Sequence, residues 1–67
     1  MPSILTKREK EVFELLIQNK STAEIADILF VSKKTVRNHI SNVIQKLGVR
    51  GRANAVITLI RMNEISL

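Results

Sequence analysis

Residues 21–48 read STAEIADILFVSKKTVRNHISNVIQKLG, and this stretch decides the fold. Ser21, followed three residues later by Glu24, has the spacing of a capping box, in which each side chain accepts a hydrogen bond from the other residue's backbone N–H. The spacing predicts a short helix over residues 22–29. Its apolar residues recur at helical spacing and line one side: Ile25, Ile28 and Leu29.

A second helix follows within the same stretch. Ser32 is a favourable N-cap, and Gly48 stands where a residue in the left-handed conformation often ends a helix. We predict a helix over residues 33–47 between them. On a helical wheel the sequence divides into two faces. The apolar face holds Val36, Ile40, Val43, Ile44 and Leu47, and the opposite polar face holds Lys34, Arg37, Asn38, Ser41 and Gln45.

Helices are also predicted on both sides of this pair. Thr6 and Glu9 repeat the capping-box spacing, and apolar residues then recur at helical intervals, which indicates a helix over about residues 6–19. Another helix is predicted over residues 52–63. The chain lacks sustained alternation and hairpin signals, and no linker or repeat interrupts it. We therefore predict one all-α domain of four helices over residues 1–67.

Length and composition restrict the function. The chain has 67 residues, no cysteine and one histidine, which is too little for a two-domain enzyme and gives no disulfide. One histidine without cysteine argues against a structural metal, and no cofactor is expected. No nucleophile–base pair, carboxylate dyad or glycine-rich phosphate loop suggests an enzyme. A domain this small gains stability from a partner chain, so oligomerisation is the remaining support.

The net charge of +5 points to an acidic partner. Residues 32–67 contain seven of the eleven basic residues and one of the six acidic ones, so the basic half is the expected contact surface. No stretch is long and apolar enough for a membrane span, and no signal peptide is recognisable. We expect a soluble cytoplasmic, nucleoid-associated protein with no membrane partner and no small-molecule ligand.

Two helices joined by a tight turn, the second with a basic polar face, have the features of a helix-turn-helix that binds double-stranded DNA. Arg37 can donate two hydrogen bonds to guanine, and Asn38 can pair with adenine. Five other side chains are expected at phosphates, where they position the protein: Lys33, Lys34, Thr35, His39 and Lys46. For His39 the alternative is a partly buried position at the edge of the core.

Residues 5–12, LTKREKEV, resemble the opening Leu-Thr-x-Arg-Glu-x-Glu-Val of LuxR/FixJ-type (NarL-type) DNA-binding domains. The similarity extends over nearly the whole chain, through Ile25, Ala26, Leu29, Ser32, Thr35, Val36, His39, Ile44, Lys46, Leu47, Arg52, Ala55 and Val56. It implies a transcription regulator and adds Ser41 to Arg37 and Asn38 as a base reader. The chain is most similar to stand-alone members of this family that control sporulation genes.

The last predicted helix has more apolar surface than one core requires. Four residues form a stripe that we expect to close the core: Ala55, Val56, Leu59 and Met62. Ala53, Ile57 and Ile60 widen the apolar arc, which indicates a second burial partner. The family resemblance agrees, since its domains commonly dimerise through this helix. We therefore predict a homodimer through these three residues, with a purely core role for Ile57 and Ile60 as the alternative.

Two other functions compete with specific DNA binding. The chain can be a protein-interaction module that acts on RNA polymerase or on another regulator, and Glu11 and Glu14 are candidate contacts with the polymerase. RNA binding is disfavoured, because stacking platforms need aromatic residues. The chain has only Phe13 and Phe30, and both are expected in the core.

Overall fold

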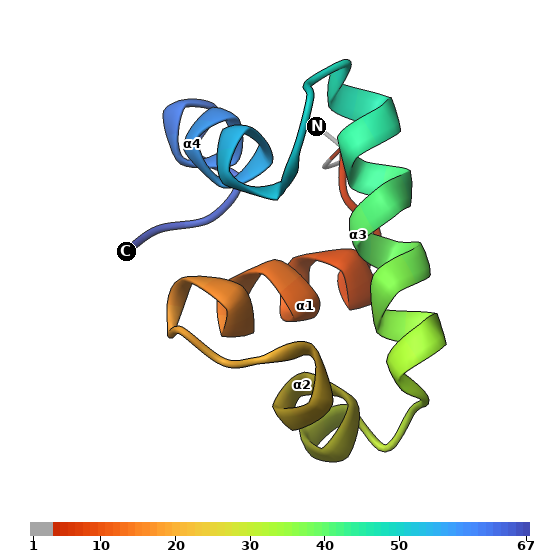
Figure 1. The fold of residues 1–67 in the computed structure, drawn as a ribbon. Coiled ribbons are helices and arrows are strands. Elements are labelled where there is room, and N and C mark those ends of the chain that lie inside the picture. The colour runs from red at the N-terminus through yellow and green to blue at the C-terminus, as the bar shows by residue number, and fades with distance from the viewer. Residues whose placement is uncertain (1–3) are drawn as a thin grey trace.

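The computed structural model describes residues 4–67 and folds them into four helices, which confirms the all-α prediction. The helices are α1 (Lys7–Ile17), α2 (Thr22–Leu29), α3 (Lys33–Leu47) and α4 (Arg52–Arg61). Helix α3 stands along one side of the molecule, and each of the other three packs against it (Figure 1). None of the helices formed by these residues is long and apolar enough to cross a membrane.

The predicted helix starts are confirmed in detail. The Thr6 hydroxyl accepts the N–H of Glu9 at 3.1 Å, and the Glu9 carboxylate accepts the N–H of Thr6 at 2.9 Å. Ser21 and Glu24 exchange the same two bonds, at 3.1 and 2.8 Å. Ser32 caps α3 through its hydroxyl. Both glutamates therefore act as caps that satisfy backbone donors at a helix start.

All four helices end in the same way. A residue with φ between 59° and 67° follows the last turn of each, and these residues are Asn19, Phe30, Gly48 and Asn63. The next residue then donates its N–H to the carbonyl five positions earlier, at 2.9 to 3.3 Å, as in a Schellman motif. The helices predicted over residues 6–19 and 52–63 consequently stop two residues early, at Ile17 and Arg61.

Phe30 does not lie in the core, so that prediction was wrong. Its side chain is 94% exposed, and its backbone has φ 59° and ψ 43°. The left-handed turn at this position directs the two neighbouring side chains, Leu29 and Val31, onto the core. Phe30 lies between them and points to solvent. One exposed ring does not make a platform of aromatic side chains on which two or three RNA bases can stack.

The core forms where the apolar faces of the four helices meet. Its buried residues are Leu5, Val12, Phe13, Ile25, Ala26, Val36, Ile40, Val43, Ala55, Leu59 and Ile65. They include most of the predicted apolar face of α3. One other prediction was wrong: Met62, expected to close the core, is 45% exposed and lies beyond the end of α4. Ile28 is 46% exposed and borders a hollow between α1 and α2.

Replacing Phe30 with glycine should stabilise the protein. The left-handed conformation costs a non-glycine residue about 1–2 kcal/mol, and the ring contributes little burial in return. The added freedom of glycine in the unfolded chain offsets about 0.4–1 kcal/mol of the gain. We expect thermal denaturation of Phe30→Gly to show a midpoint raised by about 4 °C. Phe30→Asn should give a smaller rise, and a fall in both variants would mean that the ring is stabilising.

Candidate nucleic-acid interface

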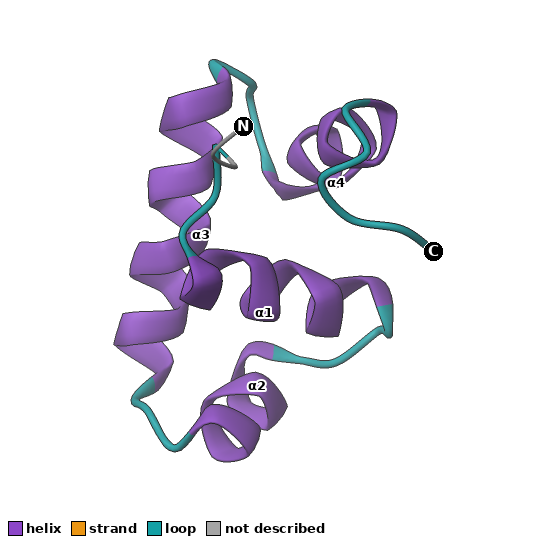
Figure 2. Cartoon of the chain, turned by 180° about the vertical axis from the view of Figure 1, so that it is seen from behind, coloured by secondary structure: helices purple, strands orange, loops and turns teal. Residues whose placement is uncertain are grey.

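Helix α3 is divided into a buried and an exposed face, as the sequence predicted. Arg37, Asn38 and Ser41 are all exposed, whereas Val36 and Ile40, interleaved with them in sequence, are buried. Seen from behind, α3 again lies at the outer edge, with the other helices to one side of it (Figure 2). The three predicted base readers therefore occupy one solvent-facing side of the helix. The second helix of a helix-turn-helix is conventionally named the recognition helix, and we use this name for α3 from here on.

The start of the recognition helix concentrates positive charge. Lys33 and Lys34 are exposed in its first turn, where no acidic residue is present. The N-terminal end of a helix already carries partial positive charge, so these lysines oppose the stability of the helix itself. The same arrangement attracts an anion, because backbone N–H groups, helix dipole and ammonium groups act together. This end of α3 is suited to bind a phosphate.

Thr35 and His39 are half-buried along the same helix. The Thr35 hydroxyl lies 3.0 Å from the Ser32 hydroxyl, so it forms part of the N-terminal cap. His39 keeps part of its surface in solvent. That position is compatible with both roles considered for it, a phosphate contact and a core-edge residue.

The polar face of α3 differs from the α1 side of the molecule. Two hollows, of about 390 and 240 Å³, are lined by residues of α1, α2 and the C-terminal segment, and Glu14 and Gln18 border both. Neither includes a residue of α3. A helix that enters the major groove needs a protruding surface rather than a pocket. The recognition helix meets that requirement.

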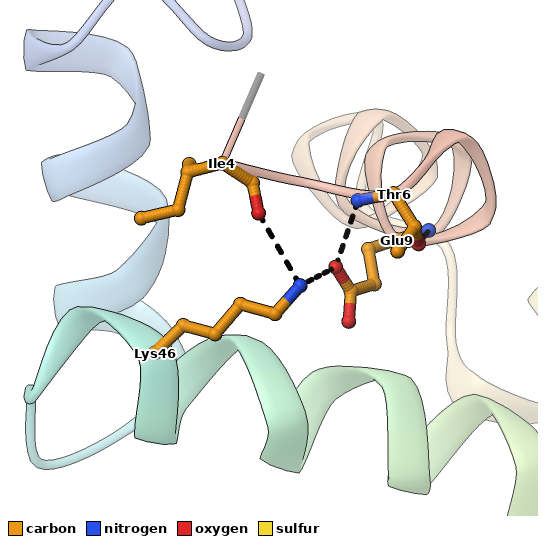
Figure 3. Close-up of polar contacts among 4 residues, drawn as sticks. All are labelled: Ile4, Thr6, Glu9 and Lys46. Carbon is orange, nitrogen blue, oxygen red and sulfur yellow. Dashed lines mark hydrogen bonds and ion pairs between the residues drawn. The ribbon is translucent and has the colours of Figure 1, made fainter. Parts of the chain in front are cut away.

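Lys46 is the one predicted phosphate contact that the structure separates from the others. It lies in the last turn of α3, and its ammonium group forms an ion pair with Glu9 (Figure 3). It also donates a hydrogen bond to the carbonyl of Ile4 at 3.3 Å. The pair joins residues 37 positions apart in the sequence. No local pattern could have indicated it.

The Glu9 carboxylate is almost fully buried, with 3% of the residue exposed. Burial raises the pKa of this carboxyl group. The hydrogen bonds from Lys46 and from the Thr6 N–H, together with the charge of Lys46, lower the pKa by more, so the net shift is downward. Glu9 is therefore ionised at neutral pH, and the ion pair is intact.

Stability should depend on pH through Glu9. A pKa lowered in the folded state adds stability above the ordinary value of 4.5, and this contribution is lost as pH falls through the lowered pKa. We expect Glu9→Gln to cost about 1.5–3 kcal/mol at pH 7, the usual value of hydrogen bonds to a charged group. Urea denaturation at pH 7 and pH 3 measures the difference in the free energy of unfolding between the wild type and Glu9→Gln. This difference should be smaller at pH 3 than at pH 7. An equal gap at both pH values would contradict this.

The predicted dimer residues of α4 differ in their exposure. Ala53 is exposed and Ile57 is 50% exposed, whereas Ile60 is half-buried and packs against the core. Met62, just beyond the helix, adds a further exposed apolar side chain. Of the three predicted dimer residues, Ala53 and Ile57 therefore lie at the surface and Ile60 contributes to the core.

Helices α2 and α3, the short turn between them and the exposed polar face of α3 define a helix-turn-helix domain of the DNA-binding class. The profile of the family described as "Bacterial regulatory proteins, luxR family" matches residues 3–59. The chain belongs to this family. It is a DNA-binding transcription regulator and not an enzyme.

Individual relatives agree with this assignment. The chain is 67% identical over 64 residues to the spore germination protein GerE of Bacillus subtilis (strain 168), covering 96% of this chain and 86% of that protein. A solved structure of the transcription factor GerE gives a TM-score of 0.95 at 55% identity, with 97% of both chains covered. The transcriptional regulatory protein DegU of Brevibacillus brevis is 45% identical over 58 residues, and the chain spans 25% of its length.

Proposed function

We propose that this chain is a sequence-specific regulator of sporulation genes that binds double-stranded DNA as a homodimer, with the recognition helix in the major groove. The observation that carries the proposal is the exposed face of Arg37, Asn38 and Ser41 on a helix whose opposite face is core. The link to sporulation rests on the 67% identity to the spore germination protein GerE.

Base reading is assigned to side chains that can make paired hydrogen bonds. Arg37 suits guanine, through its O6 and N7, and Asn38 suits adenine, through N6 and N7. Ser41, one turn further along, can contact either kind of base edge. The phosphate contacts are assigned to side chains at or near the start of the recognition helix: Lys33, Lys34, Thr35 and His39.

Arg37→Ala should weaken binding to a selected duplex by about 1–3 kcal/mol and relax the base preference at one position. Because Arg37 is exposed, the variant should fold normally. Arg61→Ala is the matched control, since it removes the same charge from an exposed position on α4. Competition between the selected duplex and a random one measures both effects. Equal losses of affinity in Arg37→Ala and Arg61→Ala would mean that Arg37 contributes only its positive charge.

Dimerisation is assigned to the outer side of α4, through Ala53, Ile57 and Ile60. Burial of the exposed half of Ile57 and of its neighbours would supply the support that a domain without disulfides lacks. A two-fold dimer would set two recognition helices about 34 Å apart, one turn of DNA, and would read a two-fold-related site.

Ile57→Glu should weaken the dimer by tenfold or more, because an interface would have to bury an unpaired carboxylate. The monomer should stay folded, since the side chain is half-exposed. Asn54→Glu introduces the same charge at an exposed polar position of α4 and should leave the dimer intact. Sedimentation of the wild type and both variants, free and with the full DNA site, measures this. A wild type that is monomeric in both conditions would refute the dimer.

RNA polymerase is assigned as the further partner, through the acidic side chains Glu11 and Glu14 of α1. Both border the hollow of about 240 Å³ between α1 and α2, together with the half-exposed Ile28. This hollow also supports the second candidate function, a protein-interaction module. Glu14→Lys tests the polymerase contact. If this variant loses promoter activation while its affinity for DNA is unchanged, Glu14 contributes to the contact with the polymerase. The proposed regulator acts in the cytoplasm, on the nucleoid.

A further inference from the structure

Lys46 holds the C-terminal end of the recognition helix against the start of α1 (Figure 3). Its ammonium group donates to the Oε1 atom of Glu9 and to the carbonyl oxygen of Ile4. The same Oε1 atom accepts the backbone N–H of Thr6 at 2.9 Å. One carboxylate oxygen thus joins the recognition helix to the N-cap of α1.

The two helix ends favour this contact electrostatically. The end of α3 carries partial negative charge and the start of α1 partial positive charge, so Lys46 and Glu9 have the signs that these ends prefer. Movement of the ammonium group to a phosphate would leave a buried, ionised carboxylate without its cation. A lysine whose charge is already compensated in this way is also a weak source of counterion release from DNA.

We propose that Lys46 is a positioning residue for DNA recognition: through Glu9 and Ile4 it sets the angle at which α3 presents Arg37 and Asn38, and it does not bind phosphate. This inference rests on the proposed function. Lys46 lies nine residues beyond Arg37, about 13 Å along the helix axis. A change of tilt at the Lys46 end therefore displaces the base readers at the other end.

The test measures affinity for a selected duplex at several salt concentrations. The variants are Lys46→Met, Glu9→Gln and the double variant, with Lys34→Gln as the reference for a phosphate contact. Glu24→Gln is the matched control: Glu24 closes the capping box of α2 as Glu9 does for α1, but it is exposed and has no ion pair among the described residues. Circular dichroism at the assay temperature checks that each variant is folded.

Lys34→Gln should reduce the steepness of the plot of log affinity against log salt by about one. Lys46→Met should lower the affinity about tenfold, because Arg37 and Asn38 are misplaced in this variant. It should leave the slope unchanged, because no phosphate contact is lost. Glu9→Gln should also lower the affinity, although it makes the protein more positive, and Glu24→Gln should not. The double variant should be no weaker than the worse single variant.

Two results would overturn the inference. A Lys46→Met slope reduced like that of Lys34→Gln would make Lys46 a phosphate contact. Tighter binding by Glu9→Gln, with a steeper slope, would mean that Glu9 only withholds Lys46 from DNA. The proposed function fails separately, in the wild type, if it binds selected and random duplexes equally.

Discussion

The structure depends on one helix, α3, that both organises the core and carries an exposed polar face. Helix α3 contacts each of the other three helices, and it also supplies the polar face assigned to DNA. Val36, Ile40 and Val43 must be buried for the domain to fold, and this leaves the positions between them free for solvent. The periodicity of 3.6 residues per turn separates the two tasks. Folding and recognition therefore constrain different positions of the same 15 residues.

The features that sequence reasoning could reach are local ones. A capping box joins residues three apart, so Thr6 with Glu9 and Ser21 with Glu24 were visible as spacings and proved to be helix starts. The faces of α3 followed from its period. Phe30 was misplaced because an apolar residue between Leu29 and Val31 reads as core, whereas a left-handed turn reverses the direction of one side chain.

The helix ends and the ion pair could not be predicted from the sequence, for different reasons. Asn19 and Asn63 are acceptable inside a helix, and nothing in their local sequence distinguished them from helical residues, although both adopt the left-handed conformation. The pair between Glu9 and Lys46 depends on the tertiary fold, which brings together residues 37 apart. Sequence reasoning assigned each residue a separate role, a cap and a phosphate contact. Arg37, Asn38 and Ser41 lie on the exposed face of α3, as its period predicted, and base reading by them stays a prediction.

The two ends of the described chain lie in different surroundings. Ile4 offers its carbonyl to Lys46 beside α3, whereas Leu67 borders a hollow with Glu14 and Ile17 of α1, away from that helix (Figure 1). A purification tag or fluorophore attached ahead of Ile4 would stand beside the C-terminal end of α3, the helix assigned to DNA. The same group attached after Leu67 would stand near the opposite end of α1. Probes for binding measurements therefore belong at the C-terminal side.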